Sequence, residues 1–229
     1  MSDLSALAGA TIVFDLDGTL VDTAPDIVGT INTLLVQEGL APLPAQASHL
    51  VIGRGAHWGL ERAFQIAGAP RSASELDTLV TRFRDHYLAH IADGSLPFPG
   101  MVEALTRLRA AGAKTVVCTN KITALSHALL DALSLSPLFD AVVGGDAVPA
   151  QKPDPRPLIQ AIAAAGGDPA RAVMVGDAAP DAGAARAAGV PLILVSFGYS
   201  ETPAADLDPD ILIHHFDELA HACQSLLNP

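Results

Sequence analysis

Two aspartates, Asp15 and Asp17, follow a short run of apolar, β-branched residues in the sequence DLDGTL. Carboxylates at this spacing just beyond a strand can point into one cleft, and Gly18 permits the sharp turn required. Such a pair could bind a cation, or supply a nucleophile and an acid. A calcium loop of the EF-hand type is excluded, because it needs Gly and Glu where this chain has Leu20 and Asp26. For this motif alone, a plain surface turn is the remaining alternative.

Three further polar groups also follow, or lie between, the apolar runs. Thr119 and Asn120 offer a hydroxyl, an amide and backbone N–H groups to an anion at a predicted helix start. Lys152, in the sequence KPDP, supplies a point charge suited to phosphate, and Asp177 and Asp181 supply two more carboxylates. Each group alone is also typical of a helix cap, a solvated lysine or a capped turn. All four groups at one edge of one sheet are hard to explain by capping alone.

Six short apolar runs predict the strands of a buried sheet: Thr11–Asp15, Thr115–Thr119, Ala141–Gly144, Ala172–Gly176, Leu192–Val195 and Ile211–Ile213. Their near-continuous apolar character, without alternation, indicates a parallel sheet covered on both faces. Helix-period segments fill most of the gaps. Strands that alternate with helices predict a doubly wound, Rossmann-like α/β fold, which binds ligands beyond the carboxyl ends of its strands.

One gap is too long for this pattern. About a hundred residues separate the first predicted strand from the second, whereas a βαβ unit needs roughly 30. Most of this stretch has helical periodicity, and Ser72 with Glu75 predicts a capping box at the start of one helix. The proline-rich stretch Leu96–Gly100 indicates a stiff return linker. We therefore expect a helical cap domain at residues 22–95, inserted into an α/β core made of residues 1–21 and 96–229.

The overall charge argues against a nucleic-acid partner. Lys and Arg total 13 against 25 acidic residues, which gives a formal net charge of −12. Such a surface repels phosphate backbones, so an anionic ligand needs a local cation. Lysine is scarce, with only Lys114, Lys121 and Lys152 in the chain.

The chain contains no segment that predicts membrane insertion or secretion. No apolar run approaches the roughly 20 residues that span a bilayer, and residues 1–9 include no basic segment. We therefore expect a cytoplasmic protein without a membrane partner. Cys118 and Cys223 form no CxxC pair, so we expect both to be reduced core residues.

The four polar groups match a known family in order and type. Asp15–Asp22 resembles the first motif of the haloacid dehalogenase superfamily, and Thr119-Asn120, Lys152-Pro153 and Gly176-Asp177 resemble its second, third and fourth motifs. The likeness covers the whole chain, including a cap at the superfamily's first insertion point. Longer stretches resemble the phosphoglycolate phosphatase branch: Phe14–Asp26, Gly144–Asp146, Lys152–Leu158 and Phe197–Tyr199. One departure is Ala178, where many relatives carry Ser.

The resemblance implies a Mg²⁺-dependent phosphatase that passes phosphate from a small phosphomonoester through an aspartyl-phosphate. Asp15 would be the nucleophile, and Asp17 the general acid that protonates the leaving oxygen and then the base that activates water. Mg²⁺ would be held by Asp15, the backbone carbonyl of Asp17, and Asp177. The implied substrate is 2-phosphoglycolate as a first guess, with a sugar phosphate as the second.

The same resemblance assigns the remaining core residues. Thr119, Asn120 and Lys152 would bind the oxygens of the transferring phosphoryl group. Asp181 would orient Lys152 or a metal-bound water.

The cap should select the substrate, and residues 22–95 contain no lysine. Arg54, in the glycine-rich stretch Ile52–Trp58, is therefore expected to reach a substrate carboxylate, whereas His57 and Trp58 are expected to pack. The stretch is not GxGxxG and follows no predicted strand, so it does not predict a dinucleotide site. The other arginines of the cap are expected to be solvated: Arg62, Arg71, Arg82 and Arg84.

Several alternatives are separable from the sequence. A dehalogenase would not need Asp17, and a phosphonate hydrolase of this superfamily would need a lysine in the cap. A β-phosphoglucomutase-like mutase remains the enzymatic alternative. A phospho-aspartate receiver domain uses similar residues but is about half as long and lacks a cap. The oligomeric state is open, with a homodimer as one candidate.

Overall fold

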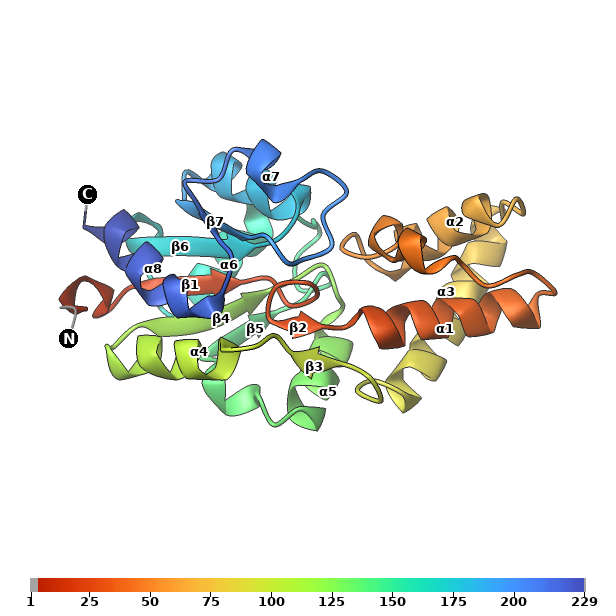
Figure 1. The fold of residues 1–229 in the computed structure, drawn as a ribbon, viewed down its shortest axis with the longest axis horizontal. Coiled ribbons are helices and arrows are strands. Elements are labelled where there is room, and N and C mark those ends of the chain that lie inside the picture. The colour runs from red at the N-terminus through yellow and green to blue at the C-terminus, as the bar shows by residue number, and fades with distance from the viewer. Residues whose placement is uncertain (1–3, 229) are drawn as a thin grey trace.

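The computed structural model describes residues 4–228 and contains a six-stranded, wholly parallel sheet in the order β5-β4-β1-β6-β7-β8 (Figure 1). The strands are β1 (Thr11–Phe14), β4 (Lys114–Cys118), β5 (Ala141–Val143), β6 (Ala172–Gly176), β7 (Leu192–Val195) and β8 (Ile211–Ile213). Every predicted strand is present, and each boundary agrees to within one residue. The predicted doubly wound parallel sheet is confirmed.

The strand order places the polar groups predicted from the sequence next to one another. β1 pairs with β4 on one side and with β6 on the other, so that Phe14 lies opposite both Val117 and Val175. The chain runs outward from β4 to β5 and then crosses back to β6, so the winding direction reverses at β1. Ligands of doubly wound sheets bind at this switch point, beyond the carboxyl ends of the strands.

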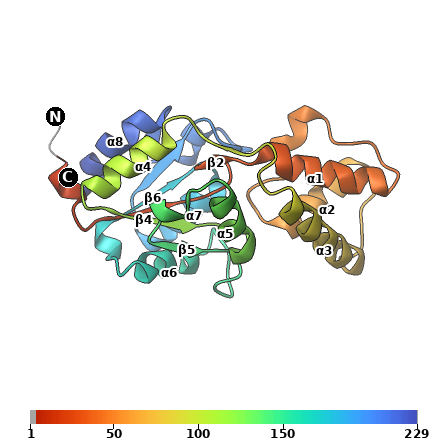
Figure 2. The same ribbon diagram turned by 90° about the horizontal axis from the view of Figure 1, so that it is seen from below.

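Helices cover both faces of the sheet (Figure 2). Ile12 and Phe14 of β1 belong to an apolar cluster with α4 and α8, whereas Val13 belongs to a cluster with α6 and α7. This alternation follows from the two-residue period of a strand that is buried on both faces. The helices of this part are α4 (Met101–Ala110), α5 (Thr123–Ala132), α6 (Arg156–Ala164), α7 (Ala179–Ala188) and α8 (Leu219–Leu227). Short 3-10 turns occur at Ser5–Leu7, Ser136–Leu138, Pro169–Arg171, Ala204–Leu207 and Phe216–Glu218.

Three helices lie beyond the carboxyl edge of the sheet, at the end of the molecule opposite α8 (Figure 1). They are α1 (Ala24–Gln37), α2 (Ala56–Ile66) and α3 (Ala73–Ala89), with a 3-10 segment at Ala45–Leu50. Their apolar stripes meet in a cluster of their own, which also includes Leu125 of α5. The predicted capping box is present at the start of α3, where the Glu75 carboxylate accepts the Ser72 backbone N–H at 2.8 Å.

Two segments of the chain connect these three helices to the sheet, and the two segments pair with each other. β2 (Val21–Asp22) and β3 (Leu96–Pro97) form an antiparallel two-stranded ribbon. We expected only a stiff linker at Leu96–Gly100, and this was wrong for its first two residues. A strand of two residues is too short to show a periodicity in the sequence. Pro97 has no backbone N–H to donate, and edge strands tolerate this.

Two smaller expectations can also be compared with the structure. Cys118 and Cys223 are both buried and free of disulfides, as predicted. Among the residues from 4 to 228, no helix combines the length and the apolar character needed to cross a membrane.

Asp26 links the start of α1 to the segment that returns from α3 to the sheet. Its carboxylate, in the first turn of α1, accepts the backbone N–H groups of Gly94 at 2.9 Å and Ser95 at 2.8 Å, and the Ser95 hydroxyl at 2.5 Å. The side chain is buried, so these bonds replace the solvation that the carboxylate loses.

Asp26→Asn should therefore destabilise the protein by about 1.5–3 kcal/mol, because an amide presents only one acceptor to these donors. Urea unfolding measures this as a lower midpoint at an unchanged slope. The matched control is Asp93→Asn, an exposed carboxylate in the adjacent turn, which should shift stability by less than about 0.5 kcal/mol. Equal midpoints for Asp26→Asn and the wild type would show that the hydrogen bonds of the Asp26 carboxylate contribute nothing to the stability of the fold.

Candidate active site

The predicted core residues converge at the switch point of the sheet. Asp15 directly follows β1, Thr119 and Asn120 follow β4, and Asp177 follows β6. Lys152 comes from the loop between β5 and α6. All five side chains are buried. The cause is topological, because parallel strands that are neighbours in the sheet end at the same edge.

Lys152 lies at the centre of the charged groups. Its ammonium donates to Asp181 Oδ1 at 2.7 Å and to the Cys118 carbonyl at 2.7 Å, and it pairs with Asp15 Oδ1 at 3.0 Å. Burial alone would lower the pKa of Lys152, but the charges of Asp15 and Asp181 raise it above its usual range. Lys152 is therefore a permanent cation. The contact with Asp181 agrees with the expectation that this aspartate orients Lys152.

Asn120 holds the Lys152 loop in place. Its Oδ1 accepts the Lys152 backbone N–H at 2.9 Å, and its Nδ2 donates to the Lys152 carbonyl at 3.1 Å. Both ends of the amide are thus engaged with one backbone unit. This geometry gives the Asn120 side chain a positioning function, and its contact with a phosphoryl group stays a prediction. Thr119 Oγ1 accepts the Lys121 N–H at 3.2 Å, and the Thr119 hydroxyl can still donate to an anion.

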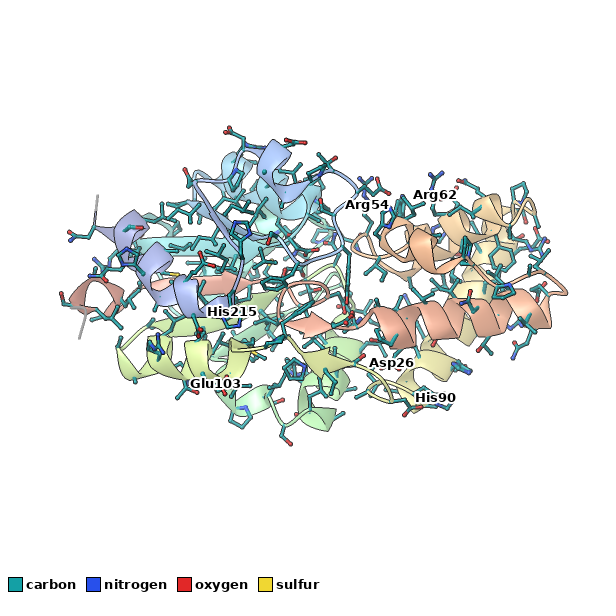
Figure 3. All side chains as sticks on the ribbon, viewed as in Figure 1. Asp26, Arg54, Arg62, His90, Glu103 and His215 are labelled. Carbon is teal, nitrogen blue, oxygen red and sulfur yellow. The ribbon has the colours of Figure 1, made fainter. Side chains whose placement is uncertain are left out.

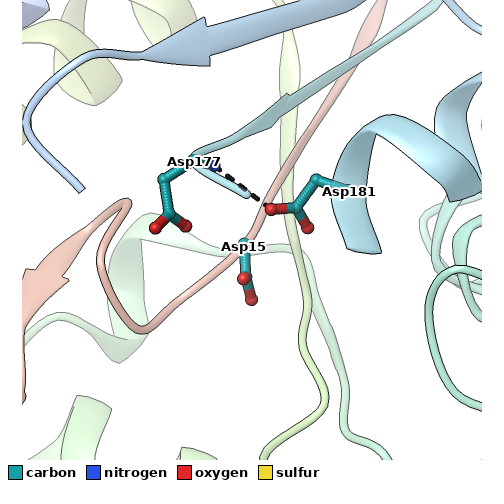
Figure 4. A group of neighbouring side chains, drawn as sticks. All are labelled: Asp15, Asp177 and Asp181. Atoms are coloured by element: carbon teal, nitrogen blue, oxygen red, sulfur yellow. Dashed lines mark hydrogen bonds between the residues drawn. The ribbon is translucent and has the colours of Figure 1, made fainter. Parts of the chain in front are cut away.

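Three carboxylates lie close together beside this one lysine, and two of them, Asp15 and Asp181, contact it. Asp15, Asp177 and Asp181 each offer one oxygen, and these oxygens all lie within 4.8 Å of one another (Figure 4). Burial raises the pKa of Asp15 to about 7, with Lys152 opposing this and the charges of Asp181 and Asp17 adding to it. The pKa of Asp177 is also raised, first by burial and then by Asp181 and Asp15. The cluster therefore carries more negative charge than Lys152 balances.

The residues present fit a hard divalent cation. The group consists of oxygen donors only, which Mg²⁺ prefers, and a cation would balance the excess negative charge. Asp181 uses one oxygen for Lys152 and the other for the backbone N–H groups of Asp177 and Ala178. Within residues 4–228, Asp15 has contacts at Oδ1 only, and Asp177 accepts from the neutral donors of Thr19 and Tyr199 and not from Lys152, so these two acids are better placed to offer an oxygen to a metal. The Asp17 carboxylate is not a member of the three-acid group, and the ligand expected from Asp17 was its backbone carbonyl.

Gly18 lets the loop after β1 approach Asp177. A Cβ at Gly18 would lie 2.6 Å from Asp177 Oδ2, and the residue has φ of +83°. The same loop donates the Thr19 hydroxyl to Asp177 Oδ1 at 3.0 Å, while the Tyr199 N–H donates to Oδ2 at 2.8 Å. A side chain at position 18 would therefore displace the carboxylate that this loop orients.

Asp17 has partners that the sequence analysis did not identify. Its Oδ1 accepts the Thr23 hydroxyl at 2.7 Å, and the Lys121 ammonium lies 2.8 Å from Oδ1 and 3.0 Å from Oδ2. Lys121 also lies over the ring of Tyr87, 4.7 Å from its centroid. Burial alone would lower the pKa of Lys121, but the charge of Asp17 raises it, so Lys121 is a cation. The scarcity of lysine was the available signal, since two of the three lysines lie in the site.

Asp17 and Lys121 border a cavity of about 150 Å³ between α1, α3 and the end of β4. Its apolar lining comes mainly from the helical segment: Ile27, Ile31, Val51, Ile52, Phe83 and Tyr87. Arg54 lines the cavity as expected (Figure 3). Arg84 is exposed, as expected, and it lines the cavity as well, which the sequence analysis did not foresee. The periodicity of α3 shows which face is apolar, but not that Arg84 lies beside the cavity.

The neighbours of Arg54 differ from the expectation in one respect. The guanidinium stacks over the ring of Trp58 at 5.0 Å, and Trp58 is half-buried. His57 is exposed and lines the cavity, so the expectation that it packs in a core was wrong. Position 57 is in the first turn of α2, where a side chain can face outward.

Comparisons with known proteins agree with this architecture. The family model of haloacid dehalogenase-like hydrolases matches residues 10–189. A phosphoglycolate phosphatase of Caulobacter vibrioides is 59% identical over 227 residues, which cover 99% of this chain and 96% of that protein. A phosphoglycolate phosphatase of Mesorhizobium japonicum is 42% identical over 208 residues, 91% of this chain and 92% of that protein.

Solved structures have the same fold. The crystal structure of a predicted phosphoglycolate phosphatase from Haemophilus somnus superimposes with a TM-score of 0.85 at 30% identity, covering 94% of this chain and 98% of that one. Together with the family model and the relatives, this shows that the chain belongs to the haloacid dehalogenase-like hydrolase family.

Proposed function

We propose that this protein is a Mg²⁺-dependent phosphomonoester hydrolase that acts on 2-phosphoglycolate through an aspartyl-phosphate on Asp15. The observation that carries the proposal is the arrangement of Asp15, which is buried beside the Lys152 cation and close to Asp177. The 59% and 42% identical relatives, both phosphoglycolate phosphatases, support the choice of substrate.

The size of the cavity also favours a small substrate. Its volume of about 150 Å³ is below the roughly 300–1,000 Å³ that is usual for sites that enclose drug-sized ligands. That space suits the two-carbon glycolate part better than a hexose ring, so a phosphosugar phosphatase or mutase is the less favoured alternative. We propose that residues 22–95 act as the cap that encloses this part of the substrate over the core formed by residues 1–21 and 96–229.

The nucleophile in this mechanism is Asp15 Oδ2. Within residues 4–228, the Leu16 N–H and the Lys152 ammonium both contact Oδ1, which leaves Oδ2 available for attack. Oδ2 forms a bond to phosphorus as the bond from phosphorus to the ester oxygen breaks. Lys152 and Thr119 stabilise the charge on the phosphoryl oxygens. Mg²⁺, held by Asp15, Asp177 and the Asp17 carbonyl, would supply the positive charge that lets the anionic phosphate approach a carboxylate.

Asp17 moves the protons. It donates a proton to the departing alkoxide, which leaves as the alcohol, and then accepts one from the water that attacks the aspartyl-phosphate. The second step releases inorganic phosphate and restores the Asp15 carboxylate. Both steps require an oxygen of Asp17 to reach the ester oxygen or the water.

Asp15→Asn should abolish turnover, because an amide cannot form the phosphoaspartate. Asp17→Asn should slow turnover by about 10²–10⁴, the usual contribution of a positioned acid and base. Phosphate release from 2-phosphoglycolate with Mg²⁺ present measures both effects, and Asp206→Asn, an exposed aspartate far along the chain, is the control. Wild-type activity in an Asp15→Asn protein shown by mass spectrometry to be free of deamidation would overturn the covalent mechanism.

Mg²⁺ should also stabilise the fold, because a ligand that binds only the native state adds about 2.7 kcal/mol at a hundred times its Kd. Thermal unfolding with and without Mg²⁺ should show this shift in the wild type and not in Asp177→Asn. Each protein is compared with its own metal-free form, because Asp177→Asn also loses one of the two acceptors that bind Thr19 and Tyr199. Excess chelator should stop phosphate release, Mg²⁺ should restore it and Ca²⁺ should inhibit it. Full activity after dialysis against chelator would contradict the metal site.

A further inference from the structure

Lys121 is the buried cation of the cavity. Its side chain is 7% exposed, and its ammonium lies under the ring of Tyr87 from α3. The two other permanent cations among the cavity residues, Arg54 and Arg84, are exposed. Water screens exposed charges, so an anion in this cavity gains most from Lys121.

In this structure both oxygens of Asp17 are engaged. Oδ1 accepts from Thr23 and Lys121, and Oδ2 accepts from Lys121. The proposed reaction requires an Asp17 oxygen to contact the leaving oxygen of the substrate. The ion pair with Lys121 holds the Asp17 carboxylate in one orientation, so a ligand that draws the ammonium away would let Asp17 turn toward the leaving oxygen.

A second polar group at the cavity is the hydroxyl of Tyr87. Within residues 4–228, the hydroxyl of Tyr87 is buried and has no partner in hydrogen-bond geometry, although it lies near enough to the Lys121 ammonium to interact with it, and Tyr87 lines the cavity. Buried hydroxyl groups are normally satisfied, so an unpaired one beside a cavity indicates a site for a polar ligand group. Lys121 and Tyr87 lie together, and a carboxylate can accept from both.

The chemistry of a phosphorylated two-carbon acid fits this pair. Its carboxylate carbon is two bonds from the ester oxygen, so an ester oxygen that faces Asp17 brings the carboxylate close to Lys121. A carboxylate is also the group that can compete with Asp17 for the ammonium, because both form the same charge-assisted bond.

We propose that Lys121 is the specificity-determining residue of this site, and that it exchanges the Asp17 carboxylate for the carboxylate of a short phosphorylated acid. The inference rests on the proposed function. Recognition of the acid group then releases Asp17 to reach the leaving oxygen, so that a substrate without this group leaves Asp17 engaged. Binding of the substrate carboxylate by Lys121 would therefore both select the substrate and position Asp17.

The test compares 2-phosphoglycolate with ethyl phosphate, which has the same ester oxygen and no carboxylate, in wild type and Lys121→Met. For the variant we expect kcat/KM for 2-phosphoglycolate to fall about 10- to 100-fold, the equivalent of one charge-assisted hydrogen bond. The value for ethyl phosphate should stay unchanged or rise, because Asp17 is no longer held. A residue that only supports the fold would lower both values together. Thermal unfolding checks that the variant folds, and Lys121→Gln, whose amide can still donate to Asp17, replaces it if it does not.

Two further variants sharpen the test. Tyr87→Phe removes a hydroxyl that has no partner in hydrogen-bond geometry within residues 4–228, so it should keep the melting temperature and still raise KM for 2-phosphoglycolate alone. Arg54→Ala should change the preference between the two substrates by less than about threefold, as expected for an exposed ion pair.

The outcomes separate the two proposals. Absence of 2-phosphoglycolate turnover by the wild type overturns the proposed function, and this inference with it. If the wild type is active, equal losses on both substrates in Lys121→Met overturn the inference alone. Loss of the preference in Arg54→Ala, with Lys121→Met unaffected, would assign the carboxylate to Arg54 instead.

Discussion

The site depends on one buried cation, Lys152, that is shared among more negative charge than it can balance. Asp15 and Asp181 contact it directly, and Asp177 lies beside them. Buried carboxylates are unfavourable unless paired, and here burial first, and then the charges of the neighbouring acids, raise the pKa of Asp15 and Asp177. In the proposed function, a divalent cation and a phosphate that enter together would relieve this imbalance, because the cation would balance the acids and Lys152 would face the new anion.

Several neighbouring residues hold these charged groups in position. Asn120 fixes the backbone of Lys152 at both polar ends of its amide, and Gly18 allows the loop after β1 to approach Asp177 within hydrogen-bonding reach of Thr19. The chain as a whole has a net charge of −12, so its general field repels phosphate. Binding of an anion therefore depends on local cations, and two of the three lysines, Lys121 and Lys152, lie at this edge of the sheet.

The sequence predicted what is local and missed what depends on packing between distant segments. Each strand of the main sheet is a short, uninterrupted apolar run, so all six were found, and the acids that follow them came together because parallel strands end at one edge. The ribbon at Val21–Asp22 and Leu96–Pro97 is too short to have a period. The pair of Asp17 with Lys121 joins residues 104 positions apart, and no spacing rule connects them. Helical periodicity predicted the apolar face of α3, but it did not predict that Arg84 would line the cavity.

Asp17 lies where the helical segment and the sheet meet, so its proposed function as the acid depends on the position of that segment. Thr23, which donates to Asp17, immediately precedes α1, and the cation that pairs with Asp17 lies against Tyr87 of α3. Asp26 then ties the start of α1 to the returning chain through Gly94 and Ser95. A change in the position of α1 or α3 would alter a contact of Asp17, whereas Asp15 is held by Leu16 and Lys152 from the core alone. In the proposed mechanism, the nucleophile Asp15 is thus held by residues of the sheet and its loops, whereas the position of the proposed acid, Asp17, depends on contacts with α1 and α3.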